Sequence, residues 1–150
     1  MDKARNAREL VESRGFGCLS TQSARHTGFP FVSIVEYAAD ATGRPVLLLS
    51  GLAVHTKNLT VDARASLIVF APGAEQDALG SARVTLMGEV RPAPEADEDD
   101  VRARYLLRHP QAEQWVGFGD FAFHRMEIAD VYYVGGFGQM GWVSGSGYRG

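Results

Sequence analysis

"SGLAVHTKNLTVDARASLIVF" occupies residues 50–70 and consists of a polar half followed by an apolar half. The apolar half, residues 65–70, is typical of a short buried strand. The polar half packs a serine, a histidine, a threonine, a lysine and an asparagine into nine residues and predicts a short helix over 54–62. So many hydrogen-bond donors ahead of a core strand raise the question of whether this segment binds a ligand.

The composition is that of a single globular domain. The 150 residues are 45% hydrophobic and 22% charged, with a formal net charge of −3. That charge argues against a general affinity for nucleic acid, which needs a concentrated basic surface. No apolar run approaches the roughly 18 residues of a membrane span, and the polar start is not a signal peptide. One cysteine, Cys18, permits no internal disulfide. We therefore expect a cytoplasmic protein that binds neither nucleic acid nor membrane.

The chain alternates short strand patterns with few helical ones. Strands are predicted over 15–22, 30–40, 45–50, 65–71, 81–92 and 121–138, and helices over 3–14, 54–62 and 95–109. Within 30–40 the alternation leaves open whether Val32 and Ile34 or the opposite set faces inward. These patterns predict a mainly β (α+β) fold, a six-stranded barrel with flanking short helices, rather than a doubly wound sheet. Residues 3–143 should form the domain, and residues 144–150 a flexible tail.

Three other motifs predict no function. Residues 136–141 match the GxGxxG pattern, but a dinucleotide site needs a following helix and a later acid, and nine residues remain after Gly141. The four histidines share no metal-ligand spacing, so we expect no metal site. Ser50 and His55 are close in sequence, but no nucleophile elbow surrounds the serine.

The polar segment 55–58 has two interpretations. A dianionic phosphate is bound by several N–H and O–H donors plus a cation, ideally near a helix N-terminus. Alternatively, the threonine and asparagine merely cap a helix, and the lysine is solvated. From the residues alone both remain open. The candidate phosphate ligands are Thr56, Lys57 and Asn58, with His55 as a further donor and Arg64 or Arg83 adding charge from neighbouring strands.

The sequence resembles the pyridoxamine-phosphate-oxidase-like FMN-binding split barrels, and within them the haem-utilisation subfamily. The similarity covers residues 5 to 143 in the family's order. The ordered set of motifs is more specific than any one of them. The matching stretches are "GFPFVSIVEYA", "GRPVLLLSGLAVHTKNLTVDARASLIVF", "ARVTLMGEV", "YLLRHPQAEQWVGFGDFAFHRM" and "VGGFGQMGWV".

The resemblance implies a Greek-key split barrel and a homodimer with two cofactor sites at the subunit interface. It implies that Ser50 and residues 55–58 line the flavin phosphate site, with Ser33 beside the flavin ring. Phe137 and Trp142 would lie at the interface, or else in the hydrophobic core. The arginine–histidine pair that binds pyridoxamine phosphate in related proteins has no match in the C-terminal sequence, so oxidation of vitamin B6 is not expected.

The haem branch of the resemblance is matched in part. Haem-handling relatives place an acid in the FGDF-type motif, which is Asp120 here, and a ligating histidine just after GGFG. This chain has Gln139 and Met140 at the second position. Methionine can ligate haem iron, so Met140 is a conceivable substitute, although a core methionine is the commoner case.

The leading hypothesis is an FMN-binding oxidoreductase acting on a small organic substrate, with the flavin carrying the redox chemistry. No catalytic side chain stands out. The alternatives are a haem-binding or haem-degrading protein and a dimeric binding module without a cofactor. The sequence does not separate FMN from the deazaflavin F420.

Overall fold

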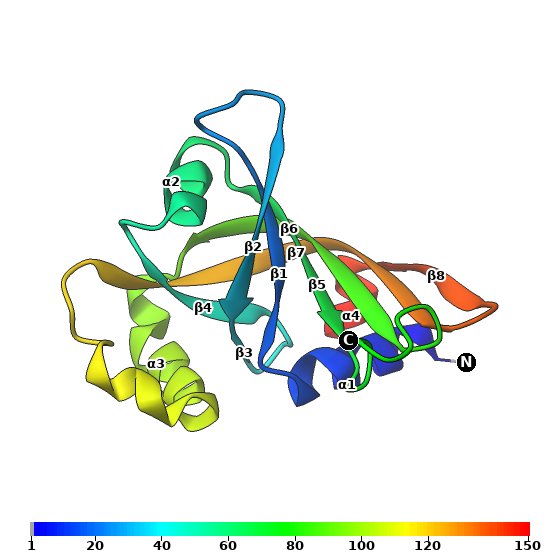
Figure 1. Cartoon of the computed structure of the whole chain (residues 1–150). Helices are drawn as coiled ribbons and strands as arrows, with labels where there is room; N and C mark the ends of the chain where they lie inside the picture. The colour runs from blue at the N-terminus through cyan, green and yellow to red at the C-terminus, as the bar shows by residue number, and fades with distance from the viewer. Residues whose placement is uncertain (1) are drawn as a thin grey trace.

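One curled antiparallel sheet forms the body of the protein (Figure 1). The computed structural model describes residues 2–150. Its eight strands follow the order β2-β1-β5-β6-β7-β4-β3, and β8 pairs with β7. The strands are β1 (Phe16–Gln22), β2 (Pro30–Glu36), β3 (Ala38–Ala39), β4 (Pro45–Ser50), β5 (Arg64–Phe70), β6 (Arg83–Pro92), β7 (Phe121–Gly136) and β8 (Gln139–Ser144). This confirms the predicted mainly β class.

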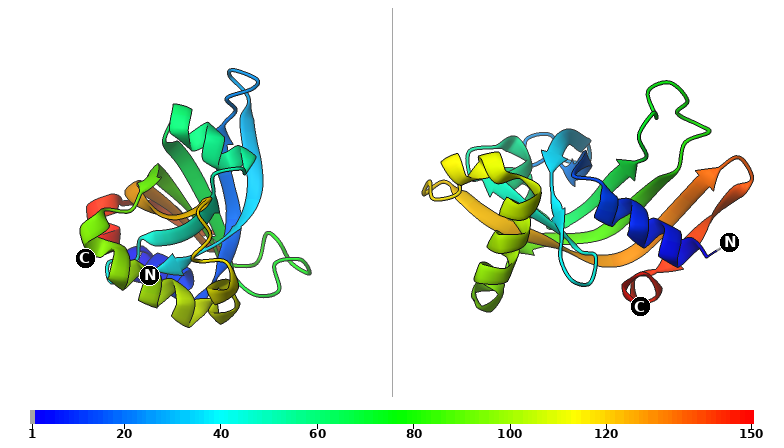
Figure 2. Two further views of the ribbon diagram at one scale, coloured as in Figure 1. Left: turned by 90° about the vertical axis from the view of Figure 1, so that its left-hand side faces the viewer. Right: turned by 90° about the horizontal axis from the view of Figure 1, so that it is seen from below.

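Short helices flank the sheet at its two ends. Figure 2 shows α2 and α3 near one end and α1, α4 and the β7–β8 hairpin near the other. The helices are α1 (Lys3–Ser13), α2 (Val54–Val61), α3 (Glu98–Arg108) and α4 (Gly145–Arg149), with the 3-10 turns η1 (Glu95–Asp97) and η2 (Pro110–Gln114). No helix within residues 2–150 is long and apolar enough to cross a membrane.

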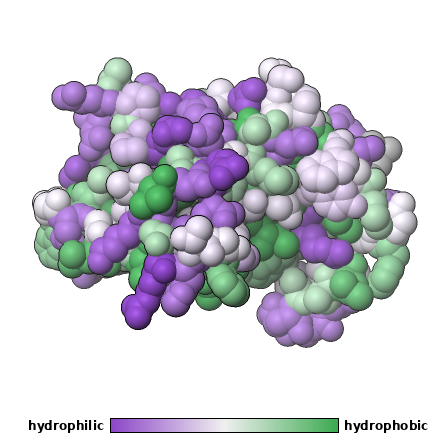
Figure 3. Space-filling model, turned by 90° about the horizontal axis from the view of Figure 1, so that it is seen from above, coloured by the Kyte–Doolittle hydropathy of each residue, from purple (hydrophilic) through white to green (hydrophobic). Residues whose placement is uncertain are grey.

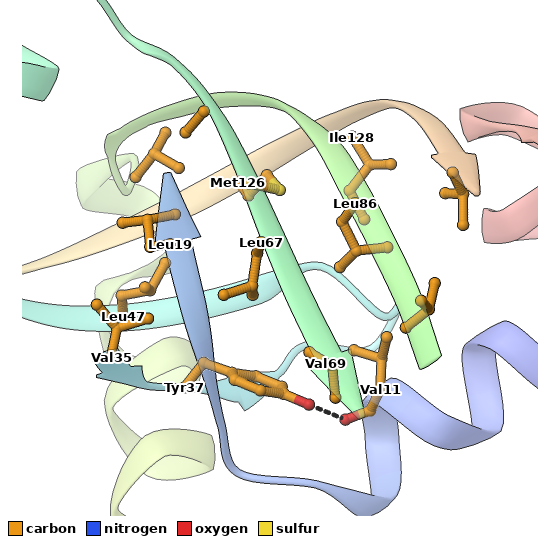
Figure 4. Packing of buried hydrophobic residues seen from close by; sticks show 14 of the residues in the cluster. Val11, Leu19, Val35, Tyr37, Leu47, Leu67, Val69, Leu86, Met126 and Ile128 are labelled. Atoms are coloured by element: carbon orange, nitrogen blue, oxygen red, sulfur yellow. Dashed lines mark hydrogen bonds between the residues drawn. The ribbon is translucent and has the colours of Figure 1, made fainter. Parts of the chain in front are cut away.

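The core lies inside the curl of the sheet, where alternate residues of each strand meet. On β5 the buried positions are Ala65, Leu67 and Val69, as the apolar run 65–70 predicted. Figure 4 shows Leu67 beside Leu86 of β6 and Met126 of β7. The strand pattern of the sequence therefore reflects one buried face.

Strand β4 is buried on both faces, which explains its uninterrupted apolar run. Leu47 and Leu49 belong to the main core, whereas Val46 and Leu48 pack in a second cluster that includes α3. A strand covered on both sides has no need of polar alternation. The second cluster attaches α3 to the sheet.

The prediction of six strands was wrong: the sheet has eight. The predicted strand 30–40 is divided at Tyr37, whose ring is fully buried and whose hydroxyl donates to the carbonyl oxygen of Val11 at 2.6 Å (Figure 4). The eighth strand arises because the chain turns at Gly136 and Gly138, both with positive φ, and pairs back on β7.

The inward face of β2 is the opposite set of the two that the sequence left open. Val35 is buried and Ser33 half-buried, whereas Val32 and Ile34 are 62% and 73% exposed. Strand β2 lies at one edge of the sheet. Its outward face is thus apolar and uncovered within this chain.

The expected flexible tail also differs from the structure. Residues 145–149 form α4, which Ser144 caps by accepting from the N–H of Gly147 at 3.0 Å. Tyr148 is 2% exposed and donates to the carbonyl oxygen of Gly43 at 2.7 Å. A single aromatic side chain gives this segment the apolar contact that its glycines and serines lack.

Candidate functional site

A cavity of about 590 Å³ opens at the end of the sheet that carries α2 and α3. Its size is within the range of small-molecule sites, ~300–1,000 Å³. Apolar and aromatic side chains form most of the wall, and within residues 2–150 the lining includes no lysine or arginine. The lining residues are Ile34, Val35, Glu36, Leu48, Leu49, Ser50, Ala53, His55, Tyr105, Trp115 and Phe121.

The structure brings three of the predicted site residues together here. Ser50 and His55 line the cavity, and Ser33 lies behind His55, its Oγ 3.2 Å from the imidazole Nδ1. Ser33 points inward because it shares the inward face of β2 with Val35. Strand β2, the end of β4 and the first turn of α2 therefore meet at one point.

His55 is an imidazole with one ring nitrogen that has no hydrogen-bond partner within residues 2–150. Burial lowers the pKa of His55 below its ordinary value, and the nearby His124 lowers it further. The Nε2 atom of His55 is buried and has no hydrogen-bond partner in the described part of the chain. The hydroxyl of Thr56, the next residue, is also buried without a partner. Unpaired polar atoms of this kind are costly and need an explanation.

The N-terminus of α2 faces the same region. Its N-cap residue, Ala53, lines the cavity and makes no side-chain capping bond. The first N–H groups of a helix then lack a protein acceptor and attract negative charge. The cavity thus has an apolar wall and one end that suits an anionic group.

Three members of the predicted phosphate segment, Thr56, Lys57 and Asn58, do not line this cavity. The side chain of Lys57 is exposed on the outer surface of α2. Asn58 is buried and fully engaged: its amide nitrogen donates to the hydroxyl of Thr21 at 3.0 Å, and its oxygen accepts from the N–H of Ala24 at 2.9 Å. Asn58 holds α2 against the β1–β2 hairpin, a structural role.

The two predicted arginines also lie elsewhere. Arg64 pairs with Asp62 at 2.7 Å and lines a different hollow of about 540 Å³ on the outside of β1, β5 and β6. Hydrogen bonds from Arg64 lower the pKa of Asp62 to about 2. Arg83 donates to three carbonyl oxygens of the preceding loop, those of Ala78, Leu79 and Ser81. Neither guanidinium belongs to the cavity.

The residues singled out for the haem alternative are divided between the two ends. Asp120 adjoins the cavity, since its Oδ2 accepts from the hydroxyl of Ser50 at 3.1 Å. Met140 lies on β8, opposite Val134 and 51% exposed, at the far end of the molecule (Figure 1). Phe137 and Trp142 share that hairpin and are 78% and 59% exposed, so within this chain they are not core.

Sequence reasoning missed most of the cavity wall. Glu36 ends β2, and Tyr105 lies on the inward face of α3, where its helical spacing indicated only packing. Trp115 and Phe121 belong to the matching stretch 105–126, but no pattern in the sequence indicates that their side chains line a cavity. Within residues 2–150 no group of three histidine, cysteine or acidic residues is arranged to hold a metal ion.

Comparisons with known proteins show the family of the chain. The family model described as "CREG, beta-barrel" matches residues 1–149. The chain belongs to the CREG β-barrel family. This CREG-type chain is 43% identical to the chloroplastic heme oxygenase HOZ of Arabidopsis thaliana over 120 residues, which are 80% of this chain and 36% of HOZ.

Solved structures show the same fold. The CREG-type chain superposes on a heme-binding protein of Mycobacterium smegmatis with a TM-score of 0.91 at 35% identity, covering 98% of this chain and 60% of that one. A FAD-binding protein of Mesorhizobium loti, at 16% identity and a TM-score of 0.67, covers 85% of this chain and 91% of its own and shows the fold alone. The chain therefore spans about a third of HOZ and three fifths of the mycobacterial protein.

Proposed function

We propose that this protein binds haem in the cavity between β2, β4, α2, α3 and η2. The observation that carries the proposal is the lining, an apolar and aromatic wall with one imidazole, His55, whose pKa burial lowers, and with no lysine or arginine from the described residues 2–150. A large flat apolar ring suits such a wall. A dianionic phosphate inside it would lack a cation.

The residues present fit the group. His55 offers a buried, unpartnered Nε2, and its Nδ1 is held by the hydroxyl of Ser33, the kind of supporting bond that orients metal-binding histidines. The uncapped N-terminus of α2 can receive a propionate. When bound, haem would supply a redox-active iron. The residue that ligates the iron would then be His55 rather than Met140, which lies at the other end of the molecule.

The relatives support haem as the first candidate ligand. HOZ is described as a heme oxygenase, and the mycobacterial neighbour as heme-binding. Since this chain spans only part of each, haem degradation is the less direct proposal, and haem binding is the one that the cavity supports. Asp120, bonded to Ser50 at the edge of the cavity, is the acid that would adjoin the group.

A flavin is the second candidate, on a separate observation. The buried hydroxyl of Thr56 has no hydrogen-bond partner among the residues that the structure describes, and the uncapped first turn of α2 lies beside it. A phosphate bound there would use both, with Lys57 one residue further on the exposed surface. FMN therefore remains a prediction, as does redox chemistry on a small organic substrate. F420 would demand more basic residues than the cavity wall holds.

A homodimer is proposed from the apolar surface around the cavity. Ile34 of β2 and Leu52, just before α2, are 73% and 74% exposed, and Phe118 is 57% exposed. Figure 3 shows apolar patches (green) among hydrophilic residues on the face seen from above. The exposed hairpin at the other end, with Phe137 and Trp142, offers an apolar counterpart on a second copy. Sedimentation velocity should give a dimer that Ile34→Glu dissociates.

Absorption titrations of the purified protein with haem and, separately, with FMN test the proposal. We expect a sharp haem band whose position changes in His55→Ala, because the iron loses its ligand. Ser33→Ala should weaken haem binding by on the order of 10-fold, because the imidazole loses its supporting bond. Arg64→Ala, outside the cavity, is the matched control.

Three other outcomes of these titrations would contradict the proposal. An unchanged haem spectrum in His55→Ala would contradict the assigned ligand. A flavin spectrum that shifts on mixing, with no response to haem, would reverse the order of the two candidates. No response to either would favour the third hypothesis, a binding module without a cofactor.

A further inference from the structure

A separate hollow of about 420 Å³ lies between the C-terminal ends of α1 and α3, beside β3. Figure 1 shows the two helices on either side of β3. The lining carries three arginines, Arg14, Arg104 and Arg108, and two carboxylates, Glu12 and Asp40. None of these five residues lines the cavity proposed for haem. We call this region the arginine hollow.

The two carboxylates of the arginine hollow are engaged by arginines outside its lining. Glu12 forms an ion pair with Arg8 at 3.0 Å. Asp40 is buried, and its two carboxylate oxygens accept from the backbone N–H and from Nε of Arg44, each at 2.9 Å. The negative charge of the lining is therefore already neutralised from outside.

The positive charge of the lining is compensated only in part. Nε of Arg104 donates to the two carboxylate oxygens of Asp100 at 3.1 and 3.0 Å. The ion pairs within residues 2–150 include neither Arg14 nor Arg108. Nε of Arg14 is buried and has no hydrogen-bond partner in the same range. The C-terminal dipoles of α1 and α3 offset roughly half a charge each, so a net positive charge remains.

Packing brings Arg14 and Arg108 to the same place. A methyl group added at Gly15 would lie 2.8 Å from Cζ of Arg108, so this guanidinium covers the residue next to Arg14. The guanidinium carbon of Arg14 lies 5.9 Å from the ring centroid of Phe16, which restricts its direction. Burial raises the pKa of Tyr37, and the nearby charges of Arg108 and Arg14 act in the opposite direction. Like charges that share one hollow repel each other, and an anion between them would remove that repulsion.

We propose that the arginine hollow binds a small organic phosphate monoester. Such a group carries a charge of about −1.5 to −2 at pH 7 and three acceptor oxygens, so it suits two guanidinium groups better than a single carboxylate does. Planar guanidinium groups bind phosphate through paired N–H bonds. The organic part would lie against Leu107, which is 85% exposed, and against Ala38 and Ala39. The hollow is within the ~300–1,000 Å³ range of small-molecule sites.

The inference goes beyond haem binding and does not rest on it, because the two sites share no lining residue. Its test therefore uses the protein without haem. Proton–nitrogen NMR at pH 7 and constant ionic strength follows the side-chain Nε–H signals of Arg14 and Arg108. The probes are inorganic phosphate and, separately, phenyl phosphate. We expect both signals to shift and saturate with each probe, and phenyl phosphate to bind more tightly because its ring contacts Leu107.

Arginine variants locate the site. Arg14→Gln and Arg108→Gln should each weaken phenyl phosphate binding on the order of 10-fold, because each removes a charge-assisted contact. Arg102→Gln removes the same charge from α3 at an exposed position outside the hollow. This matched control should leave the affinity unchanged. Arg108 is exposed as well, so Arg108→Gln decides the test even where Arg14→Gln folds poorly.

Four results would overturn the proposal. The first is the absence of a saturable shift with either probe. The second is the same shift with sodium chloride at equal ionic strength, which would indicate screening alone. The third is an equal loss of affinity in Arg102→Gln, which would indicate a general effect of charge. The fourth is binding to vesicles of phosphatidylcholine and phosphatidic acid without a response to phenyl phosphate, which would indicate a lipid headgroup rather than a small molecule.

Discussion

The two ends of the sheet are built differently (Figure 2). At the α1–α4 end, Arg8 donates to the carbonyl oxygens of Arg149 at 3.1 Å and Ala41 at 2.8 Å, and Tyr37 and Tyr148 are buried with bonded hydroxyls. At the α2–α3 end, an uncapped helix and two unpartnered polar atoms, on His55 and Thr56, adjoin a cavity. The first end is held by side-chain hydrogen bonds between distant segments, and the second is where we propose that a ligand binds.

The largest effect should come from the α1–α4 end. Tyr148→Ala removes a buried aromatic ring that holds α4, and we expect the free energy of unfolding to fall by about 3–5 kcal/mol. Tyr148→Phe removes only the bond to Gly43 and should cost about 0.5–1.5 kcal/mol. Urea unfolding measures both. A loss below that of Tyr148→Phe in the alanine variant would mean that α4 is not docked.

Two neighbours on α2 should respond in opposite directions. Asn58→Ala leaves the N–H of Ala24 without its acceptor and removes the hydrogen bond that the hydroxyl of Thr21 accepts, which should cost about 1–3 kcal/mol of stability. Thr56→Val removes a hydroxyl that has no partner, so stability should hold or rise. If the Thr56 hydroxyl contacts an anionic group, the same variant should weaken ligand binding. Equal destabilisation by both would contradict the distinction.

The pH dependence of stability should also originate at the cavity end. Burial lowers the pKa of both His55 and His124 below the ordinary value of 6.5. The unfolded chain then binds more protons than the folded one, so stability is full above pH 6.5 and falls as the pH drops below it. Replacing both histidines with glutamine should flatten the unfolding midpoint between pH 7 and 5.5. An unchanged slope would show that neither histidine is buried neutral.

The smallest effect is expected at Arg64. Arg64 forms an ion pair with Asp62 at the surface of the protein and does not line the cavity. Arg64→Ala should leave both haem and FMN titrations unchanged. A clear loss of affinity would place the cofactor in the hollow on the outside of β1, β5 and β6, where Arg64 lies.

The sequence predicted the elements more reliably than the site. Strands β4 and β5 could be predicted because burial imposes a run of apolar residues on the sequence. The start of α2 could be predicted from its cluster of polar residues. The division of 30–40 at Tyr37 and the docking of Tyr148 depend on contacts between distant segments, which periodicity does not encode. The six-strand count failed for that reason.

The site was predicted in part for a similar reason. Ser50 and His55 lie in one segment, and the donor-rich pattern marked them. Glu36, Tyr105 and Trp115 come from three separate elements, and only the fold brings them to the same wall. Arg64 and Arg83 were plausible phosphate ligands by charge alone, yet carboxylate and carbonyl partners already hold their guanidinium groups.

The most direct test of the account is a crystal structure of the protein with haem bound. We expect the porphyrin to lie in the cavity against Trp115 and Phe121, with His55 nearest the iron and the propionates toward the N-terminus of α2. A porphyrin bound in the hollow beside Arg64, without contact to this wall, would contradict it.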